Sequence, residues 1–265
     1  KRGEGGGEEH HRQDRDSYLG SMFSELLSGL GSSPERAKEL LAGLTLGCTC
    51  YAAFYAYVSR RVLESKRRAW VPTCLAATVS TAVGALVGAD ILRNHWSSGT
   101  LETLFVPRWS PDVWITETRA TKFLCVNFLS FLIVDVGLGV FQYAKHFHVL
   151  EGWVHHAVYA GFLAKIYLQG MSSVFAPFTV EELPTLILGL GTIDSRLRTD
   201  NGFGLTFFLT RILWHFFGVY NACTAPSGHP IRKEAWFGVV SMALHLHWFA
   251  KWIRKYLLGK PKKDQ

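Results

Sequence analysis

The chain has 265 residues, of which 48% are apolar and 18% charged, whereas about a quarter of the residues of a soluble domain are charged. The net charge of +7 does not indicate a nucleic-acid-binding protein, because the basic residues flank apolar runs and form no stripe with interleaved aromatics. The composition therefore predicts an integral membrane protein whose partners are membrane lipids and not nucleic acid.

Two segments precede the first long apolar run. Residues 1–17 are rich in glycine and charge and nearly devoid of apolar side chains, so we expect a disordered polar tail. Residues 18–36 should form an amphipathic interfacial helix and a linker, because the apolar residues from Leu19 to Leu30 recur on one helical face. The absence of Met at position 1 is compatible with a processed organellar protein.

Seven apolar runs follow, each near the ~20 residues that a helix needs to cross a bilayer. They predict membrane helices at residues 37–58, 70–92, 120–141, 152–169, 176–193, 205–223 and 235–257. A Gly-Met-Ser-Ser sequence and Pro177 separate the fourth and fifth runs and predict a break, which protein or a cavity must cover at membrane depth. The predicted fold class is all-α, a polytopic membrane helix bundle.

Lysine and arginine predict the orientation of this bundle. They are concentrated in the 59–68 connection and the basic C-terminal tail 259–265, so we expect both on the cytoplasmic side. The chain ends Lys262-Lys263-Asp264-Gln265, which matches the dilysine pattern that retrieval coats read at the endoplasmic-reticulum surface. A basic tail that lies at an anionic lipid surface is the alternative. We therefore expect the endoplasmic-reticulum membrane, with a mitochondrial or other organellar membrane as the alternative.

Ionisable side chains inside the apolar runs mark candidate functional residues, because they are costly in a membrane. Adjacent His155 and His156 project about 100° apart on a helix, so they cannot chelate one ion from a regular helix face and we predict no metal. A neutral imidazole can instead accept a proton from an amine or hydroxyl, or attack an activated acyl group. Hydrogen bonding of both rings to the backbone or to neighbours is the alternative.

The sixth run carries Arg211 and His215 at i, i+4 spacing, so they share a helix face and could grip a phosphate or carboxylate together. The alternative is a salt bridge from Arg211 to an acidic residue of another helix, namely Glu181, Glu182 or Asp135. His245 and His247 of the last run face different directions, and interhelical hydrogen bonding or a place at the interface is the favoured interpretation for them.

The order of these motifs resembles the TLC domain, the family named for TRAM, Lag1 and the ceroid-lipofuscinosis membrane protein. The segments that carry the resemblance are KRRAWVPTCLAATVSTAVGAL, FLSFLIVDVGLGV with Asp135, EGWVHHAVYAGFL with the histidine pair, VEELPTLILGLGTID, GFGLTFFLTRILWHFFGVY with Arg211, and ALHLHWFAKWIRKYLLGK. The resemblance covers residues 66–258 approximately. It implies six membrane helices around a lipid-accessible cavity, and the helix at 37–58 would be an extra one in front.

The resemblance also implies a chemistry. In the ceramide synthase branch of the family, the two histidines belong to the site that joins an acyl chain from acyl-CoA to a sphingoid amine. Here the segment FTVEELPTLILG offers Glu181 and Glu182 where the synthases have closely spaced aspartates. It is more similar to the smaller, non-synthase members, whose roles include phospholipid composition, lysophospholipid acylation and cargo export.

Three hypotheses follow. The first is an acyl-CoA-dependent lipid N- or O-acyltransferase without a bound cofactor. Its expected catalytic residues are His155, His156, Asp135 and Glu181, and its expected substrate contacts are Arg211, His215, Tyr159 and Glu182. The second is a non-catalytic lipid-binding, lipid-sensing or cargo protein. The third is a structural subunit of a larger membrane complex, organellar or otherwise, that uses an exposed loop with Trp96, Trp109 and Trp114 as contact area.

Overall fold

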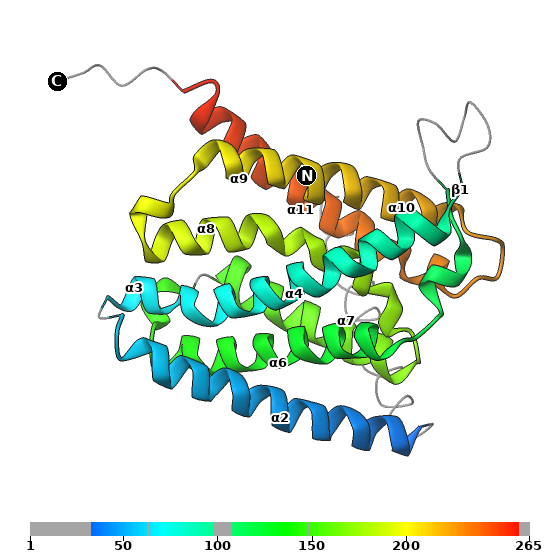
Figure 1. Cartoon of the computed structure of the whole chain (residues 1–265), viewed down its shortest axis with the longest axis horizontal. Coiled ribbons are helices and arrows are strands. Elements are labelled where there is room, and N and C mark those ends of the chain that lie inside the picture. The colour runs from blue at the N-terminus through cyan, green and yellow to red at the C-terminus, as the bar shows by residue number, and fades with distance from the viewer. Residues whose placement is uncertain (1–32, 63, 98–107, 148, 260–265) are drawn as a thin grey trace, which may run out of the picture.

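The computed structural model describes residues 33–62, 64–97, 108–147 and 149–259 (Figure 1). The predicted polar tail 1–17, the amphipathic stretch up to residue 32 and the dilysine end of the basic tail lie outside the described residues. These predictions therefore stay predictions.

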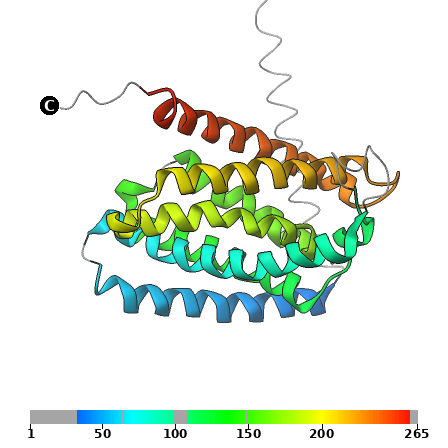
Figure 2. The ribbon, with the colours of Figure 1, turned by 45° about the horizontal axis from the view of Figure 1, so that its top comes forward.

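The described chain is a bundle of helices that lie side by side in two views, with α2 at one edge and α11 at the opposite edge (Figures 1 and 2). The helices are α2 (Pro34–Ser59), α3 (Ser65–Arg68), α4 (Trp70–Asp90), α6 (Arg119–Phe141), α7 (His155–Leu168), α8 (Leu183–Ile193), α9 (Asp200–Phe207), α10 (His215–Thr224) and α11 (Ile231–Tyr256). The only described strands, β1 (Trp96–Ser97) and β2 (Arg108–Trp109), form a short antiparallel pair at one end.

Five helical segments of the described chain are long and apolar enough to cross a membrane, so the protein is an all-α integral membrane protein. They are Pro34–Ser59, Ser65–His95, Arg119–Phe141, Ser172–Ile193 and Asp200–Thr224. Each coincides with one of the predicted runs, including the fifth run with its break. Half of the apolar stretch of α6 is buried, against 11% for α2, so α6 lies inside the bundle and α2 lies at its edge.

The two other predicted runs, 152–169 and 235–257, also form helices. The first is α7, which continues from a π-helical segment at Val149–Val154, and the second is α11. Neither is among the five, because histidine, tryptophan and charged residues lower the mean hydropathy of both.

Local sequence signals explain where several helices begin and end. Pro34 opens α2, where the missing N–H of proline costs nothing. Thr118 and Thr121 cap the first turn of α6 reciprocally, each side chain accepting the other's backbone N–H. Gly170 ends α7 with a φ of 78°, and the following Met171 N–H donates to the carbonyl of Ile166 at 2.8 Å.

The break predicted between the fourth and fifth runs exists and is covered by protein. It consists of the 3₁₀ segments Ser172–Val174 and Ala176–Glu182, in which Thr179 is fully buried. The second segment packs against α4 at Gly84, where an added Cβ would come within 2.8 Å of the backbone nitrogen of Val180. This close contact with α4 determines the position of the segment along the bundle, and therefore the position at which Glu181 enters the interior.

The predicted exposed tryptophan surface is wrong for Trp109 and Trp114. Their exposed fractions are 4% and 1%, and their rings lie 5.4 Å apart, with Trp214 a further 4.9 Å from Trp109. The backbone N–H of Trp109 donates to the side-chain oxygen of Asn221 at 2.7 Å, which holds the loop against α10. Large indole rings gain more from burial against one another than from exposure on a rim. The side chain of Trp96 is not among those described.

Candidate functional site

A cavity of about 340 Å³ lies inside the bundle, between α4, α6, α7, the 176–182 segment, α10 and α11. Its wall is mainly aromatic and aliphatic, as in most sites for small organic ligands. All eight residues expected at the site line it: Asp135, His155, His156, Tyr159, Glu181, Glu182, Arg211 and His215. Exposed His146 also lines the cavity, so the cavity reaches the surface of the bundle at that end.

On the α6–α7 side, an acid–histidine pair faces the cavity. His156 Nε2 lies 2.9 Å from Asp135 Oδ2, within ion-pair distance although not aligned as a regular hydrogen bond. The hydroxyl of buried Tyr143 donates to the other carboxylate oxygen of Asp135. Asp135 is therefore held from one side by Tyr143 and lies at ion-pair distance from His156 Nε2, while the Nδ1 of His156 has no hydrogen-bond partner among the described residues.

His155 occupies a different environment from its neighbour. Its ring lies 4.3 Å from the ring of Tyr159, centroid to centroid, and 5.7 Å from the ring of His156. The Tyr159 hydroxyl is 3.1 Å from the Ser241 hydroxyl of α11. The Nδ1 atom of His155 is likewise without a partner in the described part of the chain. The two rings thus face different neighbours, as expected from their 100° offset on a helix.

The guanidinium of Arg211 is hydrogen-bonded to groups of the protein itself. It lies in the π-helical segment Phe208–Trp214, a wide turn often found at functional sites. Its Nε donates to the backbone oxygen of Glu181 at 2.8 Å, and its Nη2 lies 3.2 Å from Glu182 Oε1 and 2.7 Å from Thr185 Oγ1. The structure therefore contains the predicted salt bridge between Arg211 and an acidic residue of another element. This salt bridge links the π-helical segment before α10 to the 176–182 break.

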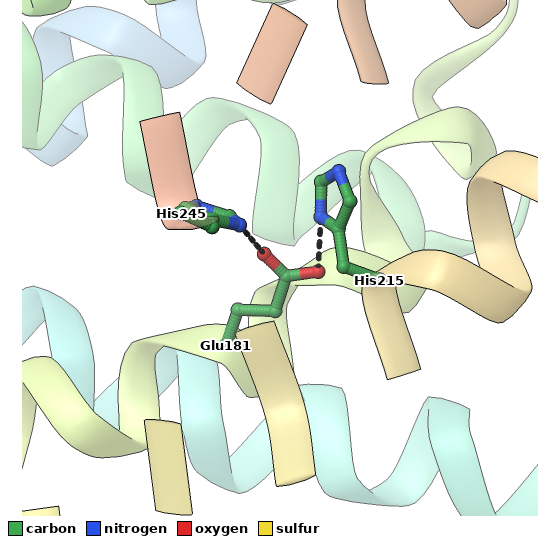
Figure 3. A group of neighbouring side chains, drawn as sticks. All are labelled: Glu181, His215 and His245. Carbon is green, nitrogen blue, oxygen red and sulfur yellow. Dashed lines mark hydrogen bonds and ion pairs between the residues drawn. The ribbon is translucent and has the colours of Figure 1, made fainter. Parts of the chain in front are cut away.

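A second acid–histidine group lies on the α10–α11 side of the cavity (Figure 3). Glu181 points one carboxylate oxygen at each of two histidines: Oε1 is 2.8 Å from His215 Nδ1, and Oε2 is 3.8 Å from His245 Nδ1. The other ring nitrogen of His215 donates to the carbonyl of Gly238 at 2.9 Å. The three side chains are 3% to 5% exposed, so the group is screened from solvent.

His245 is the residue that the predicted site lacked. It was predicted to make an interhelical hydrogen bond or to lie at the interface, and it does make a hydrogen bond to the carbonyl of Arg211 at 3.1 Å. The spacing of residues along α11 could have indicated its place at the site. Gly238, Ser241, His245 and Trp248 recur at spacings of three and four, which is one helix face, and all four line the cavity. Exposed His247 lies off that face.

Among the described residues, Glu181, His215 and His245 form the group that could hold a metal ion, because their donor atoms all lie within 4.8 Å of one another. The prediction of no metal rested on the adjacent pair His155 and His156. That argument does not apply here, since the two histidines of this group come from different helices.

The fold and the cavity define a class: an all-α integral membrane protein with two acid–histidine groups around one internal cavity. Comparison with known proteins adds no family to this class. No protein-family model, no curated protein and no solved structure matches the chain.

Proposed function

We propose that the chain is a TLC-like membrane protein of lipid metabolism that transfers an acyl group to a lipid within the cavity. The observation that carries the proposal is His156, which has Asp135 at one ring nitrogen and no described partner at the other, in an apolar-walled cavity inside a membrane bundle. This arrangement supports a general base or nucleophile, because the carboxylate orients the ring and stabilises its protonated form.

The amine or hydroxyl of the acceptor lipid attacks the carbonyl carbon of an acyl thioester such as acyl-CoA, and its proton passes to His156 Nδ1. The carbon–sulfur bond then breaks, and the leaving thiolate takes up that proton. His155, whose ring is tilted against that of Tyr159 at the same cavity, would contact the acyl carbonyl or act as the nucleophile in place of His156.

The cavity volume limits what is held inside. About 340 Å³ is at the low end of the ~300–1,000 Å³ of ligand pockets, so it suits the reacting end of a lipid and not a whole lipid with CoA. Phe128, Phe131 and Phe162 would contact acyl chain, while Arg211 and Glu182 would contact a polar headgroup. The remainder of both substrates would lie outside, in the membrane or at its surface.

Seven membrane helices are part of the proposal, with α7 and α11 added to the five apolar spans. The polar residues of α7 and α11 that lower their hydropathy include His155, His156 and His245, which line the cavity and so need not face lipid. With an odd number of spans, the residues before the first span and those after the last span lie on opposite sides of the membrane. We propose the endoplasmic-reticulum membrane with a cytoplasmic C-terminus, and another organellar membrane as the alternative.

The test is acyl transfer by the full chain in lipid nanodiscs, with labelled acyl-CoA and a panel of amine and hydroxyl lipids as acceptors. His156→Ala should abolish labelled product, and His155→Ala should lower it. His247→Ala is the matched control, because His247 is exposed on α11, away from the cavity face. Equal turnover in His156→Ala and the wild type would sink the proposal.

A non-catalytic lipid-binding protein is the second candidate, and one observation favours it. Part of the polar lining is already satisfied by protein, since Arg211 donates to the backbone oxygen of Glu181 and to the side chains of Glu182 and Thr185. Polar groups that satisfy one another need no substrate. In that case a phospholipid retained through purification should stay chemically intact when acyl-CoA is added, as native mass spectrometry would detect.

A further inference from the structure

The group Glu181, His215 and His245 draws its donors from three separate elements. Glu181 is the penultimate residue of the 176–182 segment, His215 begins α10, and His245 lies on the inner face of α11 (Figure 3). Two imidazole nitrogens and a carboxylate are a set of ligands that zinc and iron use in proteins. All three are buried, where an uncompensated carboxylate is costly.

The two hydrogen-bond acceptors around His215 require one more proton or cation than a neutral imidazole supplies. Both of its ring nitrogens face acceptors, the Glu181 carboxylate at 2.8 Å and the Gly238 carbonyl at 2.9 Å. A neutral imidazole carries one N–H and can donate to only one of them. Either an extra proton or a cation must lie between His215 Nδ1 and the carboxylate.

A metal ion satisfies that requirement with the ring orientation already present. The Gly238 carbonyl accepts from Nε2–H and so leaves the Nδ1 lone pair directed at Glu181. Metal-bound histidines usually have such a backbone or carboxylate acceptor at the second nitrogen. The arrangement of His215 is therefore that of a ligand with its outer support in place.

The distances are also close to those of a coordination sphere. Ligand bonds of about 2.0–2.1 Å in a tetrahedral zinc site separate neighbouring donor atoms by about 3.3 Å. Glu181 Oε1 is 2.8 Å from His215 Nδ1 and Glu181 Oε2 is 3.8 Å from His245 Nδ1, about half an ångström on either side, and the three ligand atoms lie within 4.8 Å of one another. His245 would exchange its Nδ1–H bond to the Arg211 carbonyl for the bond to the metal, which requires only the other tautomer of the ring.

We propose that Glu181, His215 and His245 bind a divalent transition-metal ion, zinc being the best match, with an open coordination position directed into the cavity. With neutral histidines, Glu181 and Glu182 outnumber the Arg211 guanidinium by one charge. A divalent ion reverses the sign of that excess, so the open position favours an anionic ligand such as hydroxide, carboxylate or phosphate. The ion would act as a Lewis acid on a carbonyl or phosphoryl oxygen held there.

This site is independent of acyl transfer by His156, and its test does not measure turnover. The full chain, carrying no histidine tag, is purified in nanodiscs, equilibrated with Zn²⁺ and freed of loose ions, and its metal content is measured. We expect about one ion per chain. His245→Ala and Glu181→Gln should lose it, while His247→Ala and a variant lacking His10 and His11 should keep it. Equal metal content in all of these variants would overturn the proposal.

A second measurement needs no variant and guards against misfolding. Co²⁺ added to the wild-type chain should give the intense visible absorption bands of a tetrahedral site, and Zn²⁺ should displace them. Removal of the ion by a chelator should lower the Tm of the wild type, because ligand binding to the folded state stabilises it. Absence of these bands in folded wild-type protein contradicts the site, and it then holds a proton between Glu181 and His215 instead.

Discussion

The two acid–histidine groups of the cavity differ in how many ring nitrogens of their histidines already face a partner. On the α6–α7 side, His156 has a carboxylate at one nitrogen and an unpartnered nitrogen at the other. On the α10–α11 side, both nitrogens of His215 face acceptors within hydrogen-bonding distance. The first arrangement suits proton or acyl transfer, and the second suits holding a cation. Similar residue types at one cavity can thus serve different chemistry, and the partner of each ring nitrogen decides which.

The largest expected effect is a loss of acyl transfer that leaves metal binding unchanged. Asp135→Asn keeps the shape of the side chain but removes the negative charge that stabilises protonated His156, so acyl transfer should fall by about 10²- to 10⁴-fold. The measurement is turnover of labelled acyl-CoA in nanodiscs. Metal content should stay the same, because Asp135 lies outside the Glu181 group. A parallel loss of metal would show that the two groups are not separate.

A change in packing should disturb only one of the groups. Gly84→Val drives a side chain into Thr179 and Val180, so the 176–182 segment must move away from α4 and carry Glu181 with it. We expect weaker metal binding and a loss of about 1–3 kcal/mol of stability, the usual cost of overpacking. Gly137→Ala in α6 is the matched control, since a Cβ there meets nothing within 4 Å. Unchanged metal affinity in Gly84→Val would argue against the role assigned to this contact.

A change outside both groups should have the smallest effect on the cavity. Glu117 accepts from Arg36 at 2.6 Å and from the Ser172 hydroxyl at 2.7 Å, which joins α2 to the start of the break. Burial alone would raise the pKa of Glu117, but the hydrogen bonds from Arg36 and Ser172 outweigh burial and lower it below its ordinary value. Glu117→Gln should cost about 1–3 kcal/mol at neutral pH, as for other hydrogen bonds to charged groups.

The sign of the pH dependence follows from that lowered pKa. The stabilisation by Glu117 is present above the pKa of an unfolded glutamate and is lost as the pH falls through the lower, folded pKa. The difference in Tm between the wild type and Glu117→Gln should therefore shrink only in acid. Exposed Glu35, paired with Lys38, is the control, because Glu35→Gln should change little at any pH. A Glu117 effect that persists in acid would mean that the charge does not matter.

The sequence predicted the helices well because a membrane helix is a local property. Apolar runs, Pro34 and the Gly170 break are visible without any tertiary information, and the helices form where they were expected. The number of apolar spans is less local. Five segments of the described chain are long and apolar enough to be spans, whereas polar residues, including those that line the cavity, lower the mean hydropathy of α7 and α11.

The cavity residues were predictable one by one, but not their partners. Buried charge alone marked Asp135, Glu181 and Arg211, whereas the choice of Glu182 as the partner of Arg211 depends on how α10 packs on the break. Tyr143 behind Asp135 gave no signal, because a tyrosine at a helix end is usually an interface residue. Trp109 was misjudged since burial of a loop cannot be read from its own residues.

The most direct test of the central claim is native mass spectrometry of the lipid bound to the purified chain, before and after incubation with acyl-CoA. Bound or added acceptor lipid should gain the mass of one acyl group in the wild type and in His247→Ala, and should gain none in His156→Ala. A bound lipid whose mass stays unchanged in the wild type across the whole acceptor panel would contradict acyl transfer and leave a lipid-binding protein.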